Sequence, residues 1–285
     1  MAVEFSTDRP PSPLKPPVWT WEVPLYFFVG GVAGLSAVIA LAASLTGEAA
    51  ATVAAARGVA TAGAVVSPML LIADLGRPAR FLYMLRVFKW TSAMSVGAWT
   101  LAVFSGATFV ALGLWWLAPD GPAWRAALAA ADLTAAGAGL VLATYTGVLL
   151  GATVIPVWAA HHRMLPFEFG ISSLGAAASL VELLGGFTVP LNRVAMAAAA
   201  IETALWVYRA RKPGSGTQGP RTANHAPRTA HRAPRTAGLL SGPTALILRL
   251  AGLAFLPARA GAAAAAIAGS LLLRYGWLAA GRAKV

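Results

Sequence analysis

The sequence predicts an all-α membrane protein with eight transmembrane helices, and three observations support this fold class. The 285 residues are 58% hydrophobic and 11% charged, whereas a typical soluble domain has about 25% charged residues. Apolar stretches of roughly 18 residues or more recur along the chain between Pro, Gly and charged residues, which is typical of membrane-spanning helices. No segment alternates polar and apolar residues over about 10 positions, as strands of a membrane barrel do.

The predicted spans divide the chain into four parts. A polar, Pro-rich tail (1–18) without a signal-peptide pattern precedes a six-helix part (19–209). A basic low-complexity connection (210–239) follows, and the last two spans and the C-terminal tail occupy 240–285. The spans are expected at 24–45, 52–73, 93–117, 134–158, 168–187, 190–209, 240–257 and 260–279. Trp residues fall near several span ends, where an aromatic belt is expected; they are Trp19, Trp21, Trp115, Trp116, Trp158, Trp206 and Trp277.

The distribution of Lys and Arg predicts the orientation of these spans. An even number of spans puts both termini on one side of the membrane, which we call side A. Of the 22 Lys and Arg, 16 fall on side A. Four are placed on side B (Arg57, Arg125, Arg193 and Arg259), and Arg249 and Arg274 lie within spans. Because cytoplasmic loops carry the excess of positive charge, side A and both termini are expected to be cytoplasmic, in a bacterial-type inner membrane.

The basic connection contains a seven-residue repeat built on Arg-Thr-Ala. Pro227 and Pro234 argue against a regular helix there. We interpret the segment as a solvated tether, and the alternative is a contact with anionic lipid or a partner.

The Cys and His content limits the cofactors that this chain holds. It has no Cys, and its four His (His161, His162, His225 and His231) all lie outside the predicted spans. We therefore expect no iron–sulfur cluster, no haem and no metal site in this chain. If the protein takes part in redox chemistry, the metals belong to a partner.

The loop after the second span is the most distinctive stretch. Asp74 opens an Asp-Leu-Gly-Arg-Pro sequence that contains Arg77, and Arg80 follows shortly after it. One interpretation is an interfacial loop in which Asp74 pairs with Arg77 or Arg80. The other is that these residues belong to a binding site at the membrane edge.

Two further features place polar groups where a ligand can reach them. Glu22 and Tyr26, at the start of the first span, are four residues apart and so share a helix face. Tyr145 lies within the fourth span, close to Gly147 and Gly151. A carboxylate and phenols can hydrogen-bond a quinone and exchange protons. The alternatives are a helix-capping Glu22, an interfacial Tyr26 and a helix-packing Tyr145.

Together, these stretches resemble the NrfD/PsrC family, the integral membrane subunits of polysulfide-reductase-like and related molybdopterin oxidoreductase complexes. The resemblance rests on the aromatic approach to a Gly-rich first helix, the Asp-Leu-Gly-Arg-Pro loop, Ser92-Ala93-Met94-Ser95-Val96-Gly97-Ala98-Trp99, Tyr145-Thr146-Gly147 and Leu273-Arg274-Tyr275. It covers nearly the whole chain and is strongest from 19 to 160.

The resemblance implies eight helices and a menaquinone or ubiquinone site near the membrane edge. It places the quinone contacts at Glu22, Tyr26 and Tyr145, with Asp74, Arg77 and Arg80 close to the site and to the partner. Relatives can carry Asn and His at the positions of Glu22 and Tyr26. The implied partners are an iron–sulfur subunit and a molybdopterin-type catalytic subunit, and no nucleic acid. On this basis the chain exchanges electrons between quinone and the iron–sulfur partner, and it is not catalytic alone.

Charged residues within the spans are the last group of candidates. Glu182, Glu202 and Arg249 are costly in lipid unless they are paired or hydrated, and Asp132 lies at the edge of the fourth span. One interpretation is a proton path. The other is structural pairing of Arg249 with Glu182 or Glu202. Two other functions stay open for the chain as a whole, a secondary transporter or proton channel and a membrane anchor without quinone chemistry.

Overall fold

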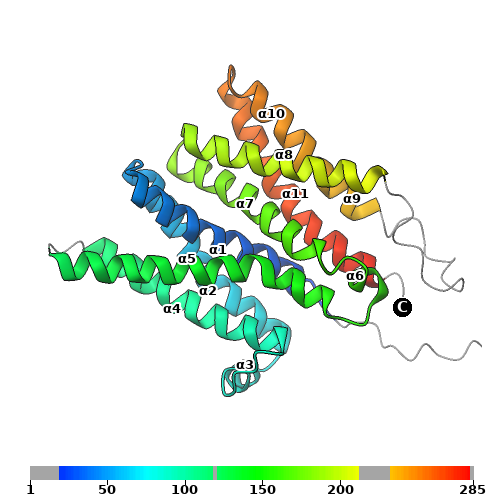
Figure 1. Ribbon diagram of the computed structural model, residues 1–285, viewed down its shortest axis with the longest axis horizontal. Helices are drawn as coiled ribbons and strands as arrows, with labels where there is room; N and C mark the ends of the chain where they lie inside the picture. The colour runs from blue at the N-terminus through cyan, green and yellow to red at the C-terminus, as the bar shows by residue number, and fades with distance from the viewer. Residues whose placement is uncertain (1–18, 118–120, 212–231, 283–285) are drawn as a thin grey trace, which may run out of the picture.

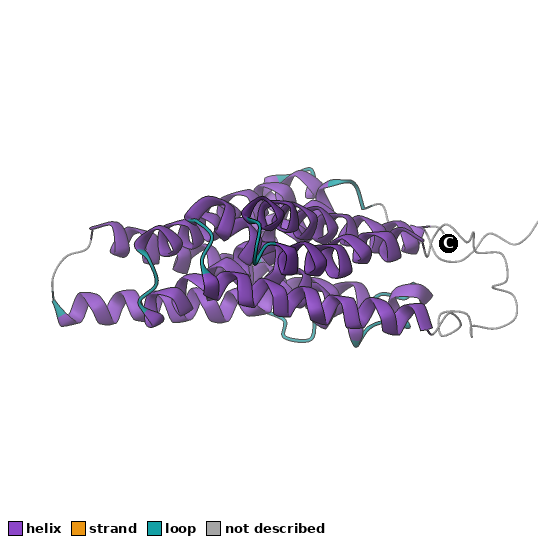
Figure 2. Ribbon diagram, turned by 90° about the horizontal axis from the view of Figure 1, so that it is seen from above, coloured by secondary structure: helices purple, strands orange, loops and turns teal. Residues whose placement is uncertain are grey.

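The computed structural model describes residues 19–117, 121–211 and 232–282, and within them the chain is helical and contains no strand (Figures 1 and 2). The helices are α1 (Glu22–Thr46), α2 (Ala50–Leu75), α3 (Pro78–Met84), α4 (Ala93–Leu117), α5 (Pro122–Gly151), α6 (Pro156–Ala159), α7 (Met164–Gly185), α8 (Val189–Arg211), α9 (Arg232–Leu239), the π-helical turn η3 (Leu240–Thr244), α10 (Ala245–Ala251) and α11 (Leu256–Arg282). The predicted tail (1–18) and most of the basic connection lie outside the described residues.

The all-α membrane fold class is confirmed, but the predicted count of eight spans is not. Within the described residues, six helices are long and apolar enough to cross a membrane: α1, α2, α4, α5, α7 and α11. Helix α8 is 23 residues long but carries several charges and is not among them. The predicted seventh span is divided, because Pro243 lies in the π-helical turn η3 and α10 ends at Ala251. Proline lacks the N–H that a regular helix needs.

Two local predictions around prolines were wrong. The span expected at 134–158 is instead helix α5, which begins at Pro122 and ends at Gly151, followed by the separate helix α6 from Pro156. A proline pushes the preceding residue out of the helical conformation, so α5 ends before Pro156. In the basic connection, Pro234 lies in the first turn of α9, where proline is tolerated because that N–H has no partner within the helix.

The helices form two groups that meet along α1 and α7 (Figure 1). The first group contains α1, α2, α4 and α5, and the second contains α7, α8, η3, α10 and α11. Helix α1 packs on α2 and α5 within its own group and on α7 and α11 of the other. In α1 and in α7, about two thirds of the most apolar 18-residue stretch is buried inside the protein. Residues on α1 therefore connect both groups.

Glycines allow the closest crossing in the first group. A Cβ on Gly34 of α1 would overlap the backbone of Gly139 on α5, and the reverse also holds. Small residues at helix crossings let backbones approach closely, which is how helices associate in lipid. Helix α1 begins at side A, and helix α5 ends there. Tyr26 and Tyr145 thus lie about 12 Å and 9 Å toward side A from this crossing, at 1.5 Å per residue.

Candidate functional site

An apolar cavity, which we call the tyrosine cavity, lies at the side-A end of the first helix group. It is formed by the approach to α1 and its first turns, the C-terminal half of α2, the start of α4 and the end of α5. With its open mouth, it encloses about 580 Å³ of space free of atoms. Its lining residues are Trp19, Val23, Tyr26, Phe27, Leu70, Leu71, Asp74, Leu75, Met84, Met94, Ala98, Tyr145 and Leu149.

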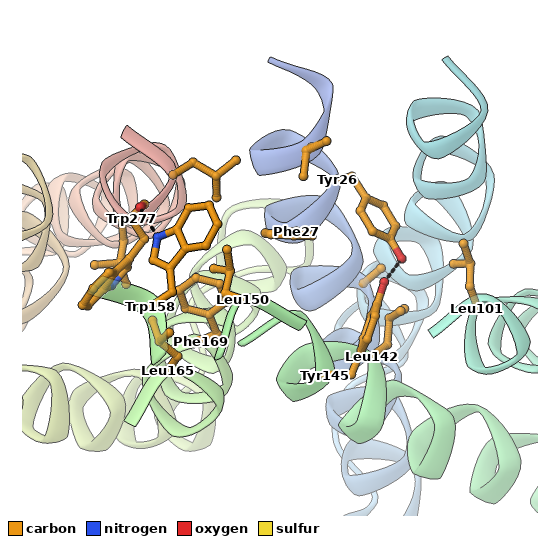
Figure 3. Packing of buried hydrophobic residues seen from close by; sticks show 14 of the residues in the cluster. Tyr26, Phe27, Leu101, Leu142, Tyr145, Leu150, Trp158, Leu165, Phe169 and Trp277 are labelled. Atoms are coloured by element: carbon orange, nitrogen blue, oxygen red, sulfur yellow. Dashed lines mark hydrogen bonds between the residues drawn. The ribbon is translucent and has the colours of Figure 1, made fainter. Parts of the chain in front are cut away.

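Two tyrosines provide phenol groups in this cavity. The hydroxyls of Tyr26 and Tyr145 are hydrogen-bonded to each other, and either one can donate (Figure 3). Both side chains are at most 7% exposed. Gly97 of α4 makes room for this pair, because a Cβ at Gly97 would collide with the ring of Tyr145. The glycine of the Ser-Ala-Met-Ser-Val-Gly sequence therefore allows Tyr145 to reach Tyr26.

Asp74 is the carboxylate that lines the cavity. Its Oδ1 accepts a hydrogen bond of 3.1 Å from the Thr20 hydroxyl, which joins the end of α2 to the chain before α1. The interpretation that Asp74 pairs with Arg77 or Arg80 is wrong, since no such ion pair forms among the described residues. Gly76 takes a left-handed conformation (φ 67°) and ends α2, and the Arg80 guanidinium instead donates to the Leu75 carbonyl at 3.1 Å.

Glu22 is the first residue of α1 and does not line the cavity. Its Oε2 atom is buried and has no hydrogen-bond partner among the described residues. A carboxylate in the first helical turn interacts favourably with the helix dipole. The N-cap residue of α1 is Trp21, without a side-chain capping hydrogen bond, so the helix-capping interpretation of Glu22 is not confirmed. The position leaves one oxygen of Glu22 able to accept a proton or a hydrogen bond.

Arg77 and Arg80 are exposed next to the cavity rather than in it. The segment from Arg77 to Trp90, which we call the α3 segment, also exposes large apolar side chains on side A. They are Leu82, Tyr83, Val87, Phe88 and Trp90, each 57% to 81% exposed. A surface that combines cations with exposed aromatic groups is typical of a protein or membrane contact.

An aromatic layer separates the cavity from the second helix group. Trp19 stacks on Trp158 at 5.3 Å, and Phe27 packs against Phe169 at 6.4 Å. The Trp158 indole donates to the Trp277 carbonyl at 2.8 Å (Figure 3). The aromatic-belt prediction is wrong for Trp158 and Trp277, which are at most 5% exposed. Span-end position alone did not distinguish a core indole from one facing lipid.

The second helix group contains a carboxylate bound by two arginines. Glu182 of α7 binds Arg249 through Oε2 at 2.7 Å and Arg259 through Oε1 at 2.8 Å. Arg249 also donates to Asn192 and Ser179 at 2.9 and 2.8 Å. Both Glu182 and Arg249 are fully buried. The Arg249–Glu182 pair is one of the two pairings expected from the sequence.

Arg274 is a buried cation that the sequence analysis did not select as a site residue. Its guanidinium donates to Ser172, Ser173 and Ser270 and to two backbone carbonyls, at 2.6 to 2.9 Å. Its side chain is fully buried and has no carboxylate within ion-pair distance in the described chain. Two features of the sequence could have indicated this site. Ser172 and Ser173 are adjacent on α7, and Ser270 and Arg274 are four residues apart on α11.

Two further buried ion pairs involve Glu168 and Asp132. Glu168, which the sequence analysis did not select, binds Arg209 at 2.5 Å toward side A. Asp132 binds both terminal nitrogens of Arg57, at 2.6 and 2.7 Å, in the first helix group. Arg57 is thus a core residue rather than a free charge of side B. Glu202 is buried beside the Ser241 hydroxyl.

No group of three His, Cys, Asp or Glu able to hold a metal ion occurs in the described parts of the chain. A comparison with known protein families matches residues 14–285 to the family NrfD_2, described as polysulfide reductase. No curated protein matches the chain.

Proposed function

Since the chain belongs to the polysulfide reductase NrfD_2 family, we propose that it is the quinone-binding membrane subunit of an oxidoreductase complex. In this proposal, quinone or quinol binds in the tyrosine cavity and exchanges electrons with an iron–sulfur partner on side A. The observation that carries the proposal is the buried Tyr26–Tyr145 pair, which presents hydroxyl donors inside an otherwise apolar cavity that also reaches Asp74.

The lining of the cavity suits a quinone headgroup. Leu70, Leu71 and Leu149 provide apolar contact for a ring and its prenyl chain. The two phenol hydroxyls can donate hydrogen bonds to a quinone carbonyl oxygen. Donation to the ligand replaces the present hydrogen bond between the two phenols. Polar groups placed singly in an apolar pocket fix the orientation of a ligand.

Proton exchange with bulk water is assigned to Asp74. Its carboxylate lines the cavity and lies at the side-A end of α2, where Thr20 holds it by a hydrogen bond. A carboxylate that reaches both the cavity and the aqueous edge can take a proton from one and deliver it to the other. Glu22, one turn before Tyr26, offers a second carboxylate, one oxygen of which has no hydrogen-bond partner in the described chain.

The α3 segment is proposed as the docking surface for the iron–sulfur partner. Its exposed Tyr83, Phe88 and Trp90 lie among Arg77, Arg80, Arg86 and Lys89. Met84, which directly follows Tyr83 in the chain, lines the cavity. A partner on this surface is therefore next to the quinone. A molybdopterin-type subunit would be attached through the iron–sulfur protein, on the cytoplasmic side by the charge distribution.

A second proposal concerns proton movement along α7. Glu168, Ser172, Ser179 and Glu182 recur on this helix and contact charged or polar groups of α8, α10 and α11. This series extends from side A toward side B. It includes the predicted residues Glu182 and Arg249 and lies near Glu202. Asp132 is not part of it, because Asp132 is bound to Arg57 in the other helix group.

The first experiment is affinity purification of the tagged full chain with its natural partners in mild detergent. We expect a Cys-rich iron–sulfur protein and bound quinone to copurify. Tyr26→Phe and Tyr145→Phe are each expected to lower quinone-linked turnover at least about five-fold, because removing a hydrogen bond in a buried site costs about 1–3 kcal/mol. Tyr208→Phe is the matched control, since Tyr208 lies on α8, outside the tyrosine cavity, and is 45% exposed. Wild-type turnover in both cavity variants would contradict the proposed site.

Proton movement is tested separately, with the purified complex in vesicles that contain a pH-sensitive dye. We expect Glu202→Gln to lower proton release while electron transfer continues. Equal proton release by Glu202→Gln and wild type would remove the α7 proposal and leave the quinone proposal intact.

A further inference from the structure

A second opening, separate from the tyrosine cavity, lies between the start of α1 and the end of α11. We call it the α1–α11 groove. It encloses about 790 Å³ of space free of atoms, its open mouth included. Its lining residues are Thr20, Trp21, Pro24, Thr236, Leu272, Tyr275, Gly276, Leu278, Ala279 and Arg282. It is larger than the tyrosine cavity.

The groove is amphipathic along its length. Pro24, Leu272 and Ala279 form apolar walls on the parts of α1 and α11 that lie within the membrane. Arg282, in the last turn of α11, is exposed at the side-A end. Trp21, which is 60% exposed, borders the same end. An apolar groove with a cation and an indole at the level of the membrane surface suits the acyl chain and the headgroup of a lipid.

The charge at this end favours an anionic occupant. Arg282 makes no ion pair with any residue that the structure describes. Glu168 binds Arg209 and Asp74 binds Thr20, and Glu22, which follows Trp21 in the chain, does not line the groove. Among the described residues that line the groove, Arg282 is therefore the one charged side chain, and the lining contains no carboxylate. Basic side chains next to the cytoplasmic leaflet bind anionic headgroups in this way.

We propose that the α1–α11 groove is a binding site for an anionic phospholipid. The headgroup phosphate binds Arg282, and one acyl chain follows Pro24, Leu272 and Ala279 into the membrane. The proposal concerns a site distinct from the tyrosine cavity and does not depend on quinone binding.

The position of the groove connects it to the approach to α1. Trp19 and Val23 line the tyrosine cavity, whereas Thr20, Trp21 and Pro24 line the groove. One turn of chain thus forms a wall of both openings. The Tyr275 hydroxyl donates to the Trp21 carbonyl at 3.0 Å and holds this turn against α11. A lipid in the groove covers the outer side of the turn whose inner side faces the cavity.

The test measures lipid retention by native mass spectrometry of the delipidated full chain in detergent. Phosphatidylglycerol and phosphatidylcholine with identical acyl chains are titrated in parallel. We expect wild type to prefer phosphatidylglycerol. Arg282→Gln is expected to weaken this binding about five-fold, the contribution of one basic residue near an anionic surface. Ala279→Trp fills the groove without a change of charge and is expected to reduce retention of both lipids.

Arg211→Gln is the matched control. Arg211 is also an exposed arginine in the last turn of a helix at side A, but it lies outside the groove. It is expected to retain phosphatidylglycerol like wild type. Equal affinity for the two lipids, equal losses in Arg211→Gln and Arg282→Gln, or full retention by Ala279→Trp would each overturn the proposal. Arg282 and Ala279 are exposed, so thermal melting is expected to show that both variants remain folded.

Discussion

Replacing Glu182 with Gln tests the second helix group most directly. Both oxygens of Glu182 are occupied, by Arg249 at 2.7 Å and Arg259 at 2.8 Å. The substitution keeps the size of the side chain and removes its charge. Arg249, fully buried, then keeps only Ser179 and Asn192 as side-chain acceptors. Removing one partner of a buried ion pair costs about 3–5 kcal/mol, and here a single change leaves two arginines without their carboxylate.

The reverse substitution is expected to be milder because the cluster is asymmetric. In Arg249→Met, Glu182 still binds Arg259, so no buried carboxylate is left without a cation. The loss is then mainly that of hydrogen bonds to buried groups, about 1–3 kcal/mol. We therefore expect Glu182→Gln to be the more destabilising variant by about 2 kcal/mol, which is roughly thirty-fold in the unfolding equilibrium.

The assay is equilibrium unfolding of the purified protein in mixed micelles with increasing sodium dodecyl sulfate, followed by helical circular dichroism. Glu48→Gln is the matched control. Glu48 follows α1 in the turn to α2 and forms no ion pair within the described residues, so its change is expected to stay within about 0.5 kcal/mol. The reasoning is refuted if Glu182→Gln unfolds like Glu48→Gln, or if Arg249→Met is the more damaging variant.

Three further predictions follow from individual contacts. Gly97→Val pushes against the Tyr145 ring and is expected to cost about 1–3 kcal/mol and lower quinone-linked turnover, whereas Gly106→Val on the same helix meets no neighbour within 4 Å and is expected to be neutral in both assays. Asp132→Asn leaves Arg57 buried without its carboxylate and is expected to destabilise by about 3–5 kcal/mol; addition of Arg57→Met is expected to restore part of that loss in the same unfolding experiment. Thr20→Val removes the hydrogen bond to Asp74 and is expected to reduce turnover about five-fold without a change in melting temperature, so unchanged turnover would contradict the role given to Asp74.

The sequence predicted helix positions well where hydropathy and helix ends coincide. The span expected at 93–117 is helix α4, and those at 24–45 and 52–73 lie within α1 and α2. The prediction from hydropathy was wrong for α5, because this helix begins at Pro122, before the apolar stretch begins. Hydropathy marks the part of a helix that suits lipid, while the helix itself continues for as long as its backbone bonds can form.

The candidate residues were predicted individually, but their partners were not. Tyr26 and Tyr145 were selected by their position in apolar spans, and each is separated from the other by 119 residues. Their contact depends on the Gly34–Gly139 crossing and on the absence of a side chain at Gly97. Arg274 was visible as a charge within a span, yet its serine partners on α7, Ser172 and Ser173, are 102 and 101 positions away in the chain.

By itself, the sequence determined that this protein is an all-helical membrane protein, and it predicts that its distinctive loop and its excess of cations share one side. These properties follow from the transfer free energy of each segment and from local charge, which add up residue by residue along the chain. Only the tertiary structure decided that Asp74 binds Thr20, that Glu182 is held by two arginines and that Arg57 is a core residue. Such pairings depend on the rotation and crossing of helices, which are set by packing between segments distant in sequence.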